Sequence, residues 1–153
     1  MKILTDDIIH FFVKQGFVIV STVDLNGGPH NSCKGIVSMD PEGSVWLLDL
    51  YRGKTHANLK ENPHISITAV DEHKFIGYTL KGKAQMIDNG AIKSHIIKAW
   101  EDRITSRLTR RVLREMREEK GHPSYPEVVL PKPEYMIAMD VEEVIDLAPH
   151  PLK

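Results

Sequence analysis

The chain of 153 residues lacks several features that would place it in a specialised class of protein. Its one cysteine, Cys33, excludes an internal disulfide bond and a zinc site built from cysteines. No apolar run approaches the ~20 residues of a transmembrane helix, and Asp6 and Asp7 interrupt any secretory signal at the N-terminus. The formal net charge of −1 is untypical of a nucleic-acid-binding domain. We therefore expect one cytoplasmic globular domain, residues 1–153, that binds neither membranes nor nucleic acids.

Motifs typical of metal sites are also missing. The eight histidines show neither a His-Glu-x-x-His motif nor a close His-x-His pair, so no metal site is expected.

The small net charge conceals an uneven distribution of charge along the chain. The net charge is −1 over residues 1–89, +4 over 90–121 and −4 over 122–153. The two oppositely charged segments could pair within one chain or across a dimer.

Hydrophobic patterning predicts a mainly β protein with a few helices. The predicted strands cover residues 17–23, 30–39, 45–48, 64–70, 75–87 and about 135–147. Glycine-containing turns at 26–29 and 40–43 join the first three strands, as in a meander. Gly77 and Gly82 indicate bends or bulges in the long fifth strand. Six strands with short turns favour a small antiparallel barrel, because closure leaves no exposed strand edge.

Helical segments are predicted at three places. Thr5 can cap a short N-terminal helix within residues 1–16. A second short helix, residues 56–61, follows the third strand and ends before Pro63. Residues 90–120 carry apolar side chains at every fourth position, a stripe that drifts around a straight helix by about 40° per step.

We therefore predict two helices within residues 90–120, with a break near Thr105 and Ser106 where either side chain could cap the second helix. A proline-rich loop, about residues 121–134, should follow.

The segment after the third strand combines groups that bind anions. Arg52 and Lys54 supply positive charge, Gly53 lets the backbone approach a ligand, and Thr55 offers a hydroxyl. The predicted helix begins directly afterwards, and its free N–H groups favour a phosphate. A solvated basic turn is the alternative interpretation of the same residues.

A second polar stretch interrupts the apolar second strand. Strand alternation places Ser32 and Lys34 on one face, and Asn31 and Cys33 on the other. Polar groups in such a strand need partners, which either a neighbouring strand or a ligand could supply. Cys33 has no second cysteine beside it, so a packed or ligand-adjacent thiol is favoured over a redox role.

The order of these segments resembles the FMN-binding split barrels related to pyridoxamine 5′-phosphate oxidase. The resemblance rests on the Gly-Gly-Pro-His turn, the polar strand, Asp-Pro-Glu-Gly, Arg52-Gly53-Lys54-Thr55 and the segment 58–63 that ends in Asn-Pro. It implies a six-stranded split β-barrel and a homodimer with FMN sites at the interface. It also implies that Lys54 and Thr55, with Arg52, hold the FMN phosphate. The flavin ring would lie along Asn31, Ser32, Cys33, Lys34 and Gly35.

The implied function is that of an FMN-dependent oxidoreductase acting on an unidentified small molecule, with NAD(P)H as a candidate electron donor. No acid–base catalyst stands out, as suits a protein whose cofactor performs the chemistry. Residues 146–153 lack the arginine-rich substrate site of the true oxidases, so vitamin B6 oxidation is not expected. Haem binding has no support in the sequence.

Two alternatives remain open at this point. One is a non-catalytic FMN carrier or sensor that signals to a protein partner through its arginine-bearing helices. Its candidate residues share one helix face, which could equally be solvated or paired at an interface: Arg103, Arg107, Arg110 and Arg114. The other alternative is a deazaflavin or another phosphorylated cofactor bound in the same cleft.

Overall fold

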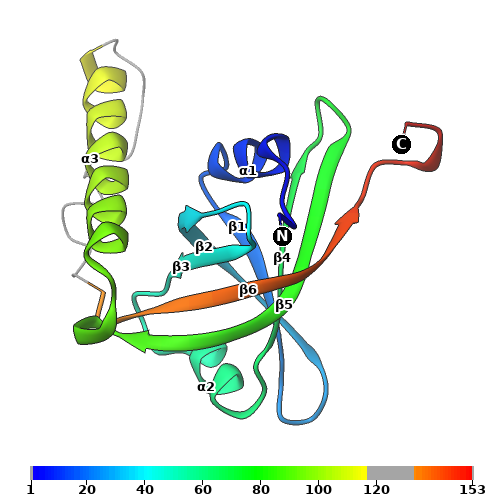
Figure 1. Ribbon diagram of the computed structural model, residues 1–153. Helices are drawn as coiled ribbons and strands as arrows, with labels where there is room; N and C mark the ends of the chain where they lie inside the picture. Colours follow the sequence, from blue (N-terminus) through cyan, green and yellow to red (C-terminus); the bar gives the residue numbers. More distant parts are fainter. Residues whose placement is uncertain (1, 117–132, 153) are drawn as a thin grey trace.

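Six antiparallel strands form a closed barrel in the order β1-β2-β3-β6-β5-β4 (Figure 1). The computed structural model describes residues 2–116 and 133–152. The strands are β1 (Val18–Val23), β2 (Pro29–Met39), β3 (Ser44–Leu48), β4 (His64–Asp71), β5 (Ile76–Asp88) and β6 (Tyr135–Asp146). The helices are α1 (Asp6–Val13), α2 (Lys54–Glu61) and α3 (Ser94–Met116), with short 3₁₀ turns η1 (Asn89–Ala91) and η2 (His150–Leu152). The mainly β fold with six antiparallel strands is confirmed.

Alternating side chains fill the barrel interior. Val18 and Val20 of β1 are buried, whereas Ile19 between them is exposed on the outer face. Ile65, Ile67 and Ala69 of β4 follow the same alternation. Each fully buried aliphatic side chain of this kind contributes roughly 1.5–3 kcal/mol. The barrel core therefore fixes which residues of each strand can reach a ligand outside it.

Local signals explain where the short helices begin and end. The Thr5 hydroxyl accepts a hydrogen bond from Ile8 N and caps α1, as predicted. Helix α2 begins at Lys54, two residues earlier than the pattern indicated. It ends at Glu61, because Asn62 before Pro63 adopts an extended conformation.

The prediction of two helices within residues 90–120 is wrong, since α3 runs unbroken from Ser94 to Met116. Ile96 and Trp100 pack with Met136 in a second apolar cluster, and Ile104 contacts its edge. Over the stripe positions from Ile96 to Ile104 the drift is small enough for one straight helix to accommodate, so Thr105 and Ser106 continue the helix instead of capping a new one.

Gly82 marks a bulge between β5 and β6. The register shifts between Lys81 and Gly82, and a Cβ at Gly82 would lie 1.9 Å from the Asp140 carbonyl oxygen. At Gly77 the pairing with β4 continues without a register shift, so this pairing has no bulge there. Most of the predicted proline-rich loop, residues 121–134, lies outside the described residues.

Candidate functional site

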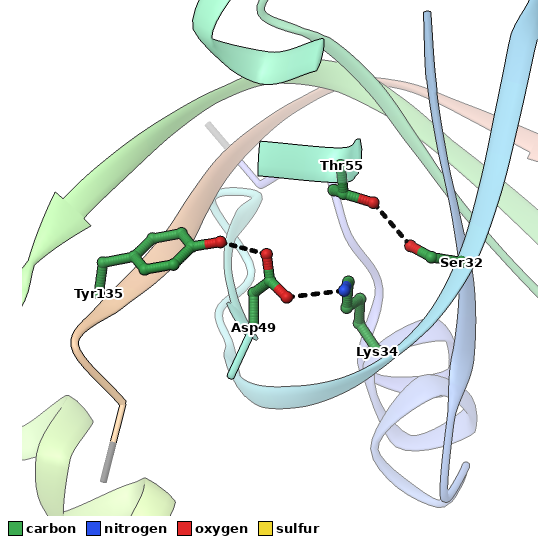
Figure 2. Close-up of polar contacts among 5 residues, drawn as sticks. All are labelled: Ser32, Lys34, Asp49, Thr55 and Tyr135. Carbon is green, nitrogen blue, oxygen red and sulfur yellow. Dashed lines mark hydrogen bonds and ion pairs between the residues drawn. The ribbon is translucent and has the colours of Figure 1, made fainter. Parts of the chain in front are cut away.

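Strand β2 and helix α2 bring two hydroxyls together at the candidate site. The hydroxyl oxygens of Ser32 and Thr55 are 2.9 Å apart, a hydrogen bond in which either can donate (Figure 2). Thr55 is buried although it lies in the first turn of a helix. The predicted basic segment and the predicted polar strand therefore meet, and we call the Ser32–Thr55 pair with the start of α2 the hydroxyl cradle.

The backbone at the start of α2 remains available to a ligand. Gly53 occupies the N-cap position, and no side chain caps this end of the helix. A Cβ at Gly53 would meet only the Tyr51 carbonyl oxygen, at 4.0 Å, so there is room beside the backbone. Uncapped N–H groups at a helix N-terminus attract anions through hydrogen bonding and the helix dipole.

A buried carboxylate that the sequence did not reveal lies next to the cradle. Asp49, just after β3, accepts a hydrogen bond from Lys34 Nζ at 2.7 Å. Its second oxygen accepts a hydrogen bond from the Tyr135 hydroxyl (Figure 2). Both Asp49 and Tyr135 are almost fully buried. Burial and the Asp49 carboxylate raise the pKa of Tyr135, so the phenol stays protonated and donates.

The rim of the site carries two further cations with acidic partners. Lys54 Nζ lies 3.4 Å from Asp24 Oδ2, and Arg52 Nη2 lies 3.4 Å from Glu134 Oε2. Both cations are largely exposed, so each pair contributes little to stability. Both cations can turn toward an anion, because leaving these carboxylates costs little free energy.

Asp24 also holds helix α2 in place. Its Oδ1 accepts a hydrogen bond of 2.9 Å from the side-chain amide of Asn58, which also donates to the Thr22 hydroxyl. The Asn58 hydrogen bond, with Lys54, keeps the pKa of Asp24 below its usual value. Asn58 thus ties α2 to the end of β1 and to the residue that follows it.

Aromatic contacts complete this end of the barrel. The Arg52 guanidinium lies over the Tyr135 ring, 5.2 Å from its centroid, and the His56 ring meets the same ring edge-on at 5.1 Å. Burial, followed by the charges of Arg52 and Lys60, lowers the pKa of His56 below its ordinary value of 6.5. His56 is therefore a neutral side chain near pH 7.

Of the eight residues predicted for the site, five lie around the cradle, two lie on the other face of β2, and Gly35 borders open space. Ser32, Lys34, Arg52, Lys54 and Thr55 lie together around the cradle. Asn31 and Cys33 occupy the other face of β2, where both are exposed and the Ser21 hydroxyl donates to Asn31 Oδ1. A Cβ at Gly35 would meet no atom within 4 Å, so space is open beside that residue.

Several residues of the site escaped prediction. Asp49 was a lone acid at the end of an apolar strand, a weak signal that could have been noticed. Tyr135 begins a strand 86 positions later, and nothing in its sequence neighbourhood points to Asp49. Asp24 and Asn58 each have ordinary surface interpretations as a turn residue and a helix residue. Only tertiary structure brings these four side chains to the site.

The described part of the chain contains neither a cluster of metal-binding side chains nor a membrane-spanning helix. No three His, Cys, Asp or Glu side chains among residues 2–116 and 133–152 group so that they could hold a metal ion. Within the same residues, no helix is both long enough and apolar enough to cross a membrane.

Comparison with known proteins decides the family. The family model of pyridoxamine 5′-phosphate oxidase matches residues 4–144. The chain belongs to the pyridoxamine 5′-phosphate oxidase family. The resemblance stated from the sequence is thereby confirmed. Comparison with curated protein sequences gave no match.

Solved structures of differently named proteins share the fold. HupZ from Group A Streptococcus is 20% identical, with 95% of this chain and 94% of that chain covered and a TM-score of 0.66. The heme storage protein HutZ from Vibrio cholerae is 17% identical, with coverage of 95% and 94% and a TM-score of 0.54. An F420 reductase is 11% identical, with coverage of 89% and 94% and a TM-score of 0.55. At these identities the likeness shows the fold alone.

Proposed function

We propose that this member of the pyridoxamine 5′-phosphate oxidase family binds FMN and acts as a flavin-dependent oxidoreductase on a small molecule. The observation that carries the proposal is the hydroxyl cradle, in which Ser32 and Thr55 meet at an uncapped helix N-terminus. Flavin binding is typical of the family. The cradle provides what a phosphate monoester requires.

The groups present fit a phosphate in charge and in hydrogen-bonding capacity. Thr55 and Ser32 can each turn a hydroxyl proton toward a phosphate oxygen, and the first N–H groups of α2 supply further donors. Lys54 at the rim supplies a charge-assisted contact once it leaves Asp24. Arg52 is half exposed beside it and can add a second one.

When bound, FMN would supply the transfer of electrons or hydride. The chain's own residues would bind and orient it. Lys34, held by Asp49, would present an ammonium group beside the cradle, toward the phosphate or the polar edge of the ring. The ring itself would lie along Asn31–Gly35, where open space adjoins Gly35.

The homodimer and the electron donor belong to the same proposal. A second copy would close the site over the outer face of β2, as the family resemblance implies. NAD(P)H is the proposed source of electrons, and the substrate is a small molecule of a kind that the site does not identify.

The first experiment measures the absorption spectrum of the purified protein and its titration with FMN. We expect saturable FMN binding with a flavin spectrum. A colourless protein that takes up no added FMN would contradict the proposal. If a ligand released from the protein had the spectrum of haem or of a deazaflavin, that compound and not FMN would be the cofactor of this cleft.

The Lys54→Ala/Thr55→Ala double variant tests the phosphate site. We expect FMN binding at least roughly 100-fold weaker, because each of the two lost hydrogen bonds to a charged group contributes about 1.5–3 kcal/mol. Lys60→Ala is the control, since it removes an exposed lysine from the last turn of the same helix. Unchanged FMN affinity in the double variant would show that the phosphate lies elsewhere.

A non-catalytic FMN carrier or sensor is the second candidate, and one contact favours it. Arg103 and Arg107 of α3 donate hydrogen bonds to the carbonyl oxygens of Gln15 and Gly16, just before β1. Helix α3 is thus tied to the segment that leads into the barrel. Reduction of bound flavin by NADH or NADPH, followed by a search for acceptors, separates the two candidates. Turnover indicates an enzyme, and stoichiometric binding without turnover indicates a carrier.

A further inference from the structure

The Asp49 carboxylate is shared between two donors from different strands. Lys34 of β2 donates to Oδ1, and Tyr135 at the start of β6 donates to Oδ2 (Figure 2). The pairing of β3 with β6 explains the second contact. Leu48 is paired with Met136, and because the strands are antiparallel, Asp49, which follows Leu48, lies beside Tyr135, which precedes Met136. The arrangement is therefore set by the barrel register.

This sharing restricts how the carboxylate can move. A buried carboxylate needs hydrogen bonds to both oxygens, since an unsatisfied charged group in the interior is strongly unfavourable. If Asp49 rotated to follow Lys34, it would lose the Tyr135 hydroxyl. The Tyr135 ring also packs edge-on against the His56 ring. This contact and the hydrogen bond to Asp49 keep the hydroxyl and the carboxylate together.

Lys34 gains a fixed position from this arrangement. A lysine side chain has four rotatable bonds and loses considerable rotamer entropy when it is ordered. In the structure the Lys34 side chain is held by the protein itself, because it is only 16% exposed and is hydrogen-bonded to Asp49 at 2.7 Å. An ammonium group held in advance binds an anion without a further ordering cost.

We propose that Tyr135 and Asp49 are positioning residues, which hold the Lys34 ammonium group beside the cradle for the bound cofactor. The inference rests on the proposed binding of FMN. Neither residue needs to touch FMN, since both act through Lys34. The two groups would thus set the affinity of the site although they lie behind it.

A double-mutant cycle on FMN affinity tests whether Tyr135 acts through Lys34. Tyr135→Phe keeps the ring that Arg52 and His56 contact and removes only the hydroxyl. We expect about 5- to 10-fold weaker FMN binding in Tyr135→Phe and a loss of similar or larger size in Lys34→Met. In the Lys34→Met background, Tyr135→Phe should change FMN affinity less than twofold. If the loss of FMN affinity in the double variant equalled the product of the losses in the two single variants, the inference would be overturned.

Tyr78→Phe is the matched control, because it removes a hydroxyl from a partly buried tyrosine that packs against Phe11 and Phe12, away from the site. We expect its FMN affinity to equal that of the unaltered protein. A loss in Tyr78→Phe equal to that in Tyr135→Phe would mean that any missing tyrosine hydroxyl weakens binding, and it would overturn the assignment.

A second measurement needs no cofactor. NMR relaxation of the lysine side chains in the ligand-free protein should show Lys34 more rigid than Lys54, which is largely exposed. In Tyr135→Phe the Lys34 side chain should become as mobile as Lys54. If the mobility of the Lys34 side chain were the same in Tyr135→Phe as in the unaltered protein, the positioning role would be overturned even if FMN binds. Failure of the unaltered protein to bind FMN would instead reject the proposed function, and the mobility of Lys34 would still decide the positioning role.

Discussion

At the residue scale, His56 shows how the site's surroundings set the charge of a single side chain. Burial, Arg52 and Lys60 all disfavour its protonated form, and only Asp49 opposes them. The ring packs edge-on against Tyr135, within the group of residues that fixes Asp49. An uncharged His56 suits this position, because another cation beside Arg52 would repel it.

The lowered pKa of His56 predicts a pH dependence of stability. Below pH 6.5 the unfolded chain takes up a proton at this histidine before the folded protein does, so the free energy of unfolding falls as the pH falls. The decrease begins near pH 6.5 and ends at the lowered pKa of the folded state. Thermal unfolding between pH 7.5 and 5, compared for the unaltered protein and His56→Gln, measures it. Parallel curves for the two proteins would contradict the assignment.

Some residues of the site could be recognised from the sequence and others could not. Ser32, Lys34 and Thr55 were recognisable because polar residues in an apolar strand, and a cation–hydroxyl segment before a helix, are conspicuous locally. Asp49 and Tyr135 were not, because their significance depends on the pairing of β3 with β6. A hydrogen bond between residues 86 positions apart leaves no local trace.

At the element scale, the bulge at Gly82 lets β5 and β6 stay paired over most of their length. The pairing runs from Tyr78 opposite Asp146 to Asp88 opposite Tyr135, with its shift at Lys81 and Gly82. The close approach of the Asp140 carbonyl oxygen leaves no room for a side chain at Gly82. The start of β6, and with it Tyr135, depends on this pairing.

Gly82→Ala should therefore destabilise the protein by about 3 kcal/mol, because its Cβ would meet backbone atoms that cannot move aside cheaply. Urea unfolding followed by circular dichroism measures the change. Gly90→Ala serves as the control, since a Cβ there meets nothing within 4 Å. Equal stability of the two variants would show that the bulge can rearrange.

Helix α3 shows where pattern analysis failed at this scale. The four-residue apolar repeat predicted a break, because a straight helix cannot keep such a stripe on one surface. In the described residues only the stretch from Ile92 to Ile104 packs in the second apolar cluster. Over this stretch a straight helix accommodates the drift of the stripe, so the four-residue repeat does not require a break.

At the scale of the whole molecule, the outer face of the barrel carries large exposed apolar side chains. Ile19 of β1 is 46% exposed and is paired across the strands with Cys33 of β2, which is exposed too. Val70 and Phe75, on and just after β4, are more exposed still. A second copy of the chain covering this face would remove apolar surface from water.

The proposed homodimer predicts a solution mass of twice 17.4 kDa. It also predicts that a charge placed on this face weakens both dimerisation and FMN binding. Ile19→Lys should raise the dimer dissociation constant roughly tenfold or more, because burial of an unpaired ammonium group is costly. Sedimentation with and without FMN measures both effects. Leu25→Lys, at the 85% exposed hairpin tip, is the control. A monomer with full FMN affinity would reject the shared site.

The sequence by itself determined the strands, the short helices and the residues that form the cradle. Those features depend on neighbours in the chain: alternating burial, a capping threonine, an Asn-Pro stop and a cluster of cations before a helix. Only the tertiary structure decided that α3 is unbroken and that, of the two glycines where bends or bulges were predicted, Gly82 lies at a register shift. It alone showed that Asp49 joins Lys34 to Tyr135. The shift and the Asp49 contacts depend on which distant strands pair and in which register, and no local sequence pattern specifies that pairing.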